Sequence, residues 1–282
     1  MRTFAYSMST QAFPIGVFDS GYGGLTVLKE FVHTLPGYDF IYLGDNARAP
    51  YGSRSFDTVH EYTWECVQKL FDMGCRLVIL ACNTASAKAL RTIQQNDLPK
   101  YDSARRVLGV IRPTSEIIGN FTQTRSVGIF ATAGTVQSES YPLEIHKFFP
   151  DIQVYQEACP MWVPLIENDE YDKTGADYFV QKHIHNLMRA SGDIDTIVLG
   201  CTHYPLLMEK IKRYLPKHIQ IFSQGEIVAL SLKTYLEKHT EINARCSRKG
   251  EITFYTTDST ELFDKHATHF FGRDVESRPL HI

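Results

Sequence analysis

Two cysteines stand in surroundings that suit proton transfer. Cys82 follows the apolar run 77–81 and opens the segment Cys-Asn-Thr-Ala-Ser, and Cys201 follows the apolar run 196–200. A thiol at the start of a helix is shifted toward thiolate from its reference pKa of ~8.5. Each of these cysteines is therefore expected to accept a proton near neutral pH. The competing interpretation is a small buried residue at the end of a core strand, which is the commoner fate of any single cysteine.

The neighbours of the two thiols add donors and a second titrating group. Asn83 and Thr84 follow the first thiol and suit a bound carboxylate, and His203 lies two residues after Cys201, where it can tune or relay a proton. A metal site would need further ligands with a recognisable spacing, and the sequence supplies none, so no metal is expected. The other cysteines are interpreted as structural: 66, 75, 159 and 246.

A glycine-rich turn lies near the start of the chain. Asp19-Ser20-Gly21-Tyr22-Gly23-Gly24 follows one apolar run and precedes a segment of helical period. Backbone N–H groups at such a turn can hold a carboxylate or a phosphate. The turn lacks the Gly-Lys-Ser/Thr ending of a nucleotide-binding loop. The alternative is a tight strand-to-helix turn with Asp19 or Ser20 as the N-cap.

Short apolar, β-branched runs alternate with longer segments of helical period along the chain. Leu25, Leu28, Val32 and Leu35 have helical spacing, for example, as do Leu207, Ile211 and Leu215. This alternation is typical of an α/β protein whose parallel sheet is covered by helices. The expected strands are 15–18, 40–43, 77–81, 107–111, 127–130, 196–200, 220–222 and 252–255.

A weak internal repeat organises these elements. Segment 15–20 resembles 127–132, and segment 78–82 resembles 197–201. The two segments begin 63 residues apart in the first half and 70 residues apart in the second half. Apolar strands of this kind also recur by chance. A true repeat predicts two related α/β lobes, each with a cysteine just past the carboxyl end of a strand, where open α/β sheets bind ligands. The two edges would then form one cleft with a thiol on each wall.

Paired thiols on opposite walls suit one reaction class in particular. One thiol can remove a proton from one face of a carbon while the other returns a proton to the opposite face, which inverts a stereocentre. A cysteine hydrolase would need one Cys, one His and an oxyanion hole, which leaves the second thiol unexplained. A non-catalytic two-lobed binding protein for acidic amino acids is the third alternative, and it would normally carry a secretion signal.

Composition limits the partners and the compartment. The 282 residues, 43% of them hydrophobic, can bury a large core in two domains. A formal net charge of -3 without a long basic run argues against nucleic acid as a partner. No apolar run approaches the ~20 residues that cross a bilayer, so a membrane role is not expected. Residues 1–11 lack the apolar core of a secretory signal, which predicts a cytoplasmic protein with reduced thiols.

At these residues the sequence resembles the bacterial glutamate racemases of the aspartate/glutamate racemase superfamily. The resemblance runs from Pro14 onward and rests on four motifs in this order: Asp-Ser-Gly-x-Gly-Gly, Pro-Tyr-Gly, Cys-Asn-Thr-Ala and Gly-Cys-Thr-His-Tyr-Pro. It implies two pseudo-symmetric flavodoxin-like lobes with parallel sheets and a substrate cleft between them. The second lobe, 109–216, is expected to be inserted into the first, which comprises 12–108 and 217–282.

The resemblance also implies roles for individual residues. Cys82 and Cys201 match the pair of catalytic thiols, with Asp19 assisting the first and Glu167 and His203 assisting the second. Asp19 and His203 are also expected to bind substrate. The other expected substrate contacts form two groups. Asn83, Thr84 and Thr202 match contacts for the α-carboxylate and amino group, and Ser20, Tyr51, Gly52 and Thr132 match contacts for the side-chain carboxylate. Thr135 is a weaker candidate.

The substrate and biological setting follow from the resemblance alone. It implies interconversion of L- and D-glutamate without a cofactor, supply of D-glutamate for peptidoglycan, and a homodimer. Aspartate racemases are similar in fold but usually lack the Cys-Thr-His-Tyr-Pro form, so glutamate is the expected substrate and aspartate the alternative. Three segments depart from the family pattern. Residues 1–11 extend beyond the usual start, 99–106 is a longer connection, and Arg112-Pro113-Thr114 replaces a Pro-Gly at the expected hinge.

Overall fold

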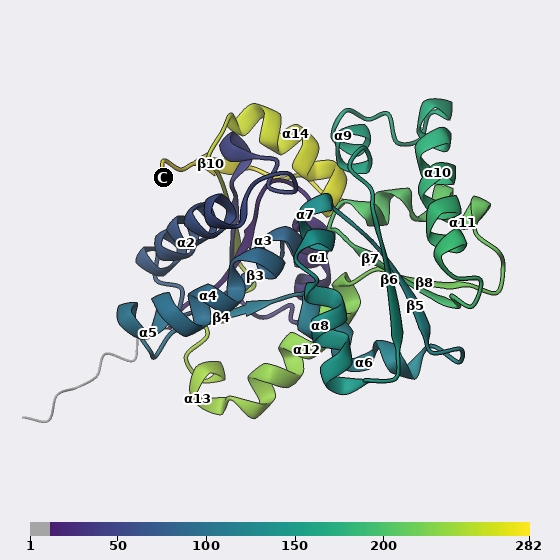
Figure 1. The fold of residues 1–282 in the computed structure, drawn as a ribbon. Coiled ribbons are helices and arrows are strands. Elements are labelled where there is room, and N and C mark those ends of the chain that lie inside the picture. The colour runs from purple at the N-terminus through teal and green to yellow at the C-terminus, as the bar shows by residue number, and fades with distance from the viewer. Residues whose placement is uncertain (1–11) are drawn as a thin grey trace, which may run out of the picture.

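The computed structural model describes residues 12–282, which form two parallel β-sheets interleaved with helices (Figure 1). The extension 1–11 lies outside the described residues. The prediction of a cytoplasmic protein, which rests on that segment, is therefore not tested by the structure. Within 12–282, no helix combines the length and the apolar character needed to cross a membrane. We refer to each sheet with its covering helices as a lobe.

The first lobe is built on a six-stranded sheet in the order β10-β9-β2-β1-β3-β4. All of its strand pairs are parallel. Its strands are β1 (Ile15–Asp19), β2 (Phe40–Gly44), β3 (Leu77–Leu80), β4 (Arg106–Gly109), β9 (Ile252–Thr256) and β10 (Ser277–Pro279). Strands β1 and β3 are buried along their whole length, which accounts for their continuous apolar sequences.

The second lobe is built on a four-stranded parallel sheet in the order β6-β5-β7-β8. Its strands are β5 (Ser126–Ala131), β6 (Gln153–Ala158), β7 (Thr196–Gly200) and β8 (Gln220–Phe222). The order matches β2-β1-β3-β4 of the first sheet, with β5 in the place of β1 and β7 in the place of β3. The internal repeat in the sequence therefore corresponds to a structural repeat, and the predicted α/β class with two pseudo-symmetric parallel sheets is confirmed.

The structure corrects three expectations about strands. Strand β4 ends at Gly109, two residues early, because Ile111 begins a helix. Strands β6 and β10 were not expected from the sequence. The expected boundary after residue 216 places 220–222 in the first lobe, whereas β8 pairs with β7 in the second sheet. The return to the first lobe therefore comes after Phe222, because a strand that continues the second sheet cannot also belong to the first.

Helices cover both sheets (Figure 1). Helix α1 buries Leu25, Leu28 and Phe31, and this explains its spacing of apolar residues. The longer helices are α1 (Leu25–Thr34), α2 (Phe56–Asp72), α8 (Ser140–Phe148), α10 (Thr174–Ala190), α12 (Gly225–Lys238) and α14 (Thr260–Phe271). The shorter ones include α3 (Asn83–Lys88), α5 (Leu98–Tyr101), α6 (Ile111–Ile117), α7 (Ala133–Gln137), α9 (Trp162–Glu167) and α11 (Met208–Tyr214).

Two chain segments connect the lobes, one from β4 to α6 and one from β8 to α12. The buried Gln224 joins them, because its Nε2 donates to the backbone oxygen of Val110 at 3.1 Å and to Oγ1 of Thr114 at 3.0 Å. The segment Arg112-Pro113-Thr114 lies in the first turns of α6. The two connections are thus held together at the point where the chain passes from one sheet to the other.

Candidate active site

The two sheets meet at the carboxyl ends of their central strands. Cys82 follows β3 and Cys201 follows β7, and both thiols are buried. Asp19, the last residue of β1, accepts a hydrogen bond at 3.5 Å from Oγ1 of Thr202, which lies in the second lobe. Thr26 Oγ1 donates to the backbone oxygen of Thr202 at 2.9 Å. Strand ends that are far apart in the sequence are therefore in direct contact at this junction.

Cys82 is the N-cap residue of α3. Its Sγ accepts a hydrogen bond from the backbone N–H of Ala85 at 3.4 Å and lies 3.4 Å from Oγ of Ser20. Burial raises the pKa of Cys82 to about 12, and the Asp19 carboxylate adds to the shift, while these two hydrogen bonds oppose it. The expectation of a lowered pKa was therefore wrong for this thiol. Loss of hydration and a nearby negative charge outweigh the helix terminus.

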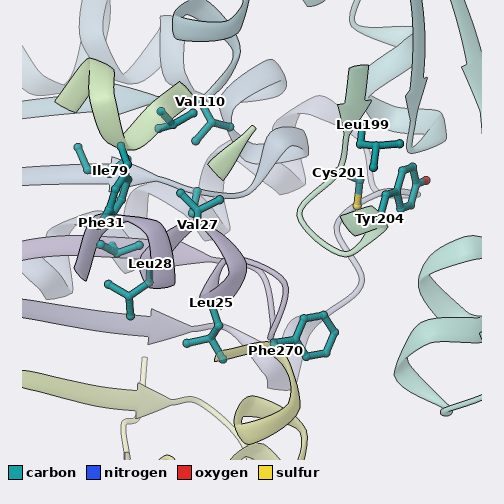
Figure 2. Close-up of a cluster of buried hydrophobic side chains, with 14 of the residues drawn as sticks. Leu25, Val27, Leu28, Phe31, Ile79, Val110, Leu199, Cys201, Tyr204 and Phe270 are labelled. Carbon is teal, nitrogen blue, oxygen red and sulfur yellow. The ribbon is translucent and has the colours of Figure 1, made fainter. Parts of the chain in front are cut away.

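Cys201 lies beside an ion pair between the buried His203 and the partly exposed Glu167. Its Sγ is 4.0 Å from Nδ1 of His203, whose Nε2 lies 2.9 Å from Oε1 of Glu167. Burial alone would lower the pKa of His203, but hydrogen bonds with Cys201 and Glu167 raise it to about 10. The imidazole is consequently a cation at neutral pH, held between a thiol and a carboxylate. Figure 2 shows Cys201 beside Tyr204, just past Leu199 of β7.

The carboxyl group of Asp19 lies between the two thiol segments. Its Oδ1 accepts from the backbone N–H of Gly21 at 2.9 Å. Burial raises the pKa of Asp19 above its ordinary value, and the His203 cation opposes that shift. Helix α1 begins at Leu25 with Gly24 as its N-cap, so neither Asp19 nor Ser20 caps it, contrary to the alternative interpretation of the turn.

The glycines of this turn allow the two lobes to approach closely. A Cβ atom on Gly23 would lie 2.3 Å from Oγ1 of Thr202 and 2.4 Å from Nδ1 of His203. A Cβ atom on Gly24 would lie 2.6 Å from Cβ of Asp19. Side chains at these positions would displace the residues around both thiols. Gly23 is therefore needed because the second lobe packs directly against its backbone, and Gly24 because Asp19 of the same turn does so.

Hydroxyl and amide groups surround the start of α3. Oγ1 of Thr84 lies 2.9 Å from Oγ1 of Thr132 and 3.4 Å from Oγ1 of Thr135, both in the second lobe. Thr132 is the N-cap of α7, and its hydroxyl accepts the N–H of Thr135. Asn83 is buried, and its Nδ2 has no hydrogen-bond partner among the described residues. These groups supply donors for an anion at the junction.

Tyr51 and Gly52 lie on the first-lobe side of the same junction. The backbone oxygen of Gly52 accepts from the N–H of Gly134 at 2.8 Å, which adds another contact between the lobes. The buried hydroxyl of Tyr51 donates to Oδ2 of the buried Asp45, which also pairs with Arg48. Because this hydrogen bond uses the only donor of the phenol, Tyr51 can donate to a bound carboxylate only through its backbone N–H.

Sequence reasoning missed two residues of the junction, Tyr141 and Thr26. The hydroxyl of Tyr141 donates to Oδ1 of Asn83 at 2.7 Å across the lobes. No pattern distinguishes it among the 15 tyrosines of the chain.

Among residues 12–282, no three His, Cys, Asp or Glu side chains gather in a geometry that could hold a metal ion. The arrangement pairs two buried thiols with a carboxyl on one side and an imidazolium on the other, which suits acid/base chemistry.

Comparison with known proteins agrees with this geometry. A glutamate racemase from Persephonella marina is 38% identical over 269 residues, which are 95% of this chain and 97% of the relative. A solved glutamate racemase isoform from Bacillus anthracis superimposes with a TM-score of 0.87 at 33% identity and covers 96% of this chain and 98% of its own.

A second solved structure is the glutamate racemase of Francisella tularensis in complex with D-glutamate. It has a TM-score of 0.84 at 31% identity and covers 95% of this chain and 97% of its own. The model of the Asp/Glu/Hydantoin racemase family matches residues 15–229, which include the second sheet, strands β1 to β4 of the first sheet and both thiols. The chain belongs to the Asp/Glu/Hydantoin racemase family.

Proposed function

We propose that this protein is a glutamate racemase that interconverts L- and D-glutamate with Cys82 and Cys201 as its two acid/base groups. The observation that carries the proposal is the pair of buried thiols at the ends of β3 and β7, each in a different electrostatic environment. The relatives named glutamate racemase, one of them in complex with D-glutamate, support the choice of substrate.

In one direction Cys201 acts as the base. The His203 cation, backed by Glu167, places a positive charge beside the sulfur of Cys201, where a base that removes a proton carries its negative charge. The thiolate takes the α-hydrogen as a proton, so that the Cα–H bond breaks and an S–H bond forms. The electron pair left on Cα delocalises into the substrate α-carboxylate.

Cys82 acts as the acid in the same direction. Its raised pKa keeps it as a thiol at neutral pH, ready to give its proton to the opposite face of Cα. The new Cα–H bond completes the inversion, and the two sulfurs have exchanged their protonation states. In the reverse direction Cys82 is the base and Cys201 the acid. Asp19 is in contact with Thr202 and close to Cys82. It is proposed to assist the Cys82 thiolate in returning to its thiol form.

The substrate carboxylates are proposed to be held on two sides of the junction. The Nδ2 of Asn83 and the hydroxyls of Thr84 and Thr202 are assigned to the α-carboxylate and amino group. They would also stabilise the negative charge that grows on this carboxylate during proton removal. Ser20, the Tyr51–Gly52 backbone and Thr132 are assigned to the side-chain carboxylate.

The proposed setting is the supply of D-glutamate for peptidoglycan by a cytoplasmic homodimer. The reaction as proposed needs no cofactor. Purified protein dialysed against a chelator, with no pyridoxal phosphate added, is therefore expected to racemise L-glutamate fully when optical rotation is followed. L-Aspartate in a parallel assay is expected to turn over much more slowly.

Other outcomes of this assay would contradict the proposal in different ways. Absolute dependence on a metal or pyridoxal phosphate would exclude the two-thiol mechanism. Release of a second product would indicate a cysteine hydrolase, and binding of glutamate without loss of rotation would indicate a binding protein. Faster turnover of L-aspartate than of L-glutamate would change the substrate assignment.

A further inference from the structure

We propose that Tyr141 is a positioning residue for this reaction: its hydroxyl orients the Asn83 amide toward the substrate, and its ring sets the spacing between the two thiol-bearing strand ends. The inference rests on the racemase function proposed above. Tyr141 belongs to α8 in the second lobe and is completely buried.

The first contact is with the segment that carries Cys82. The Tyr141 hydroxyl donates to Oδ1 of Asn83 at 2.7 Å, and Asn83 directly follows Cys82. A side-chain amide whose oxygen is held in this way must present its NH₂ group elsewhere. The Nδ2 of Asn83 is buried and has no hydrogen-bond partner among the described residues. A buried donor left without a partner is costly, and this one is accounted for if a substrate carboxylate accepts from it.

The second contact is with the segment that carries Cys201. A Cβ atom on Gly200 would lie 3.0 Å from Cε2 of Tyr141, so the ring packs directly against the backbone of that residue. Gly200 is the last residue of β7 and directly precedes Cys201. One rigid side chain therefore touches the neighbour of each thiol. Because proton transfer depends steeply on distance and orientation, such a spacer affects the reaction without touching the substrate.

The surroundings of Tyr141 keep it a donor. Burial raises the pKa of the phenol far above its usual range, the nearby Cys201 adds to the shift, and a hydrogen bond with Gln224 opposes it. The neutral hydroxyl can therefore donate to Asn83 throughout the working pH range. Gln224 is the residue that joins the two connections between the lobes. The orientation of the Asn83 amide is thus linked to the place where the lobes are joined.

The test separates the hydroxyl from the ring. Tyr141→Phe keeps the ring against Gly200 and removes the hydrogen bond, so the expected result is a rise in KM and a fall in kcat/KM of about ten- to a hundredfold. Tyr141→Leu also removes the ring and is expected to lower kcat in addition to raising KM. Tyr38→Phe is the matched control, because its hydroxyl contacts Asn243 in the first lobe, away from the thiols. It is expected to leave both constants unchanged.

A double-mutant cycle distinguishes positioning from general stabilisation. If Tyr141 acts through Asn83, adding Tyr141→Phe to Asn83→Ala should change kcat/KM by less than about twofold, because the two effects are not independent. Full additivity of the two effects, or unchanged kinetics in Tyr141→Phe, would overturn the proposal. If Tyr141→Phe does not fold, the side-chain ¹⁵N signal of Asn83 in the unmodified protein is the test. It must shift when glutamate binds, and an unshifted signal would contradict the proposal.

The same measurements separate this inference from the function on which it rests. An unmodified protein without glutamate turnover would contradict the racemase proposal, and the role of Tyr141 with it. An active unmodified protein with a Tyr141→Phe variant of equal activity would contradict the role of Tyr141 alone.

Discussion

Replacing either Cys82 or Cys201 with alanine is expected to lower kcat for glutamate racemisation at least about a thousandfold in both directions, within the range that one positioned acid/base group contributes. Each thiol is the base in one direction and the acid in the other, so neither direction can proceed with one of them. Cys201→Ala also leaves the His203 cation without its sulfur partner. Initial rates measured separately from L-glutamate and from D-glutamate check the expectation.

Cys75→Ala is the matched control for these variants. Cys75 is also a buried free thiol of the first lobe, and it packs in the hydrophobic core. Its loss is expected to lower stability slightly and to leave the rates nearly unchanged. A Cys82→Ala or Cys201→Ala variant that folds and retains near-normal turnover in either direction would show that the thiol concerned is structural.

Gly23→Ala is expected to lower kcat/KM about a hundredfold, although the change adds only one methyl group. The new Cβ atom would lie 2.3 Å from Oγ1 of Thr202 and 2.4 Å from Nδ1 of His203. Relief of these contacts requires a shift of about 1 Å, which moves the imidazole away from Cys201 or separates the lobes. Overpacking of this kind also costs about 1–3 kcal/mol of stability. Kinetics at saturating glutamate and a thermal melt measure the two effects.

Gly37→Ala is the control for this variant. A Cβ atom on Gly37 would meet nothing within 4 Å, so activity and stability should stay close to those of the unmodified protein. Activity of Gly23→Ala within about twofold of the unmodified protein would mean that the close approach of the turn to Thr202 and His203 is not needed for catalysis.

The central strands of both sheets could be predicted from the sequence because they are buried on both faces. Strands β1 and β7 carry unbroken runs of buried residues that are mostly apolar, Ile-Gly-Val-Phe and Ile-Val-Leu-Gly, and this is a strong local signal. Strand β6 was missed because it is an edge strand with the sequence Gln-Val-Tyr-Gln-Glu-Ala, whose polar residues interrupt the apolar pattern. Strand β10 has only three residues, and its signal comes from pairing with β9 rather than from its own composition.

The contacts across the junction could not be predicted, because they depend on how the two lobes pack together. Nothing local to Tyr141 indicates that it reaches Asn83, 58 residues earlier in the chain. The pKa of Cys82 illustrates the same limit. The sequence correctly indicated a thiol at a helix start, but the shift is set by burial and by Asp19, which are properties of the assembled fold. The pairing of Glu167 with His203 likewise joins α9 to the end of β7.

The direct test of the two-thiol account is the fate of solvent hydrogen in the first turnovers. When L-glutamate reacts in heavy water, the thiol that removes the α-hydrogen cannot easily return a solvent deuteron to the same face, whereas the opposite thiol has already exchanged with solvent. The account predicts that D-glutamate carries deuterium from the first turnover, while the remaining L-glutamate stays unlabelled at low conversion. The mirror result is expected from D-glutamate. Mass spectrometry of the separated enantiomers provides the measurement, and comparable early labelling of both pools would indicate a single base that serves both faces and would contradict the assignment of Cys82 and Cys201 as a pair.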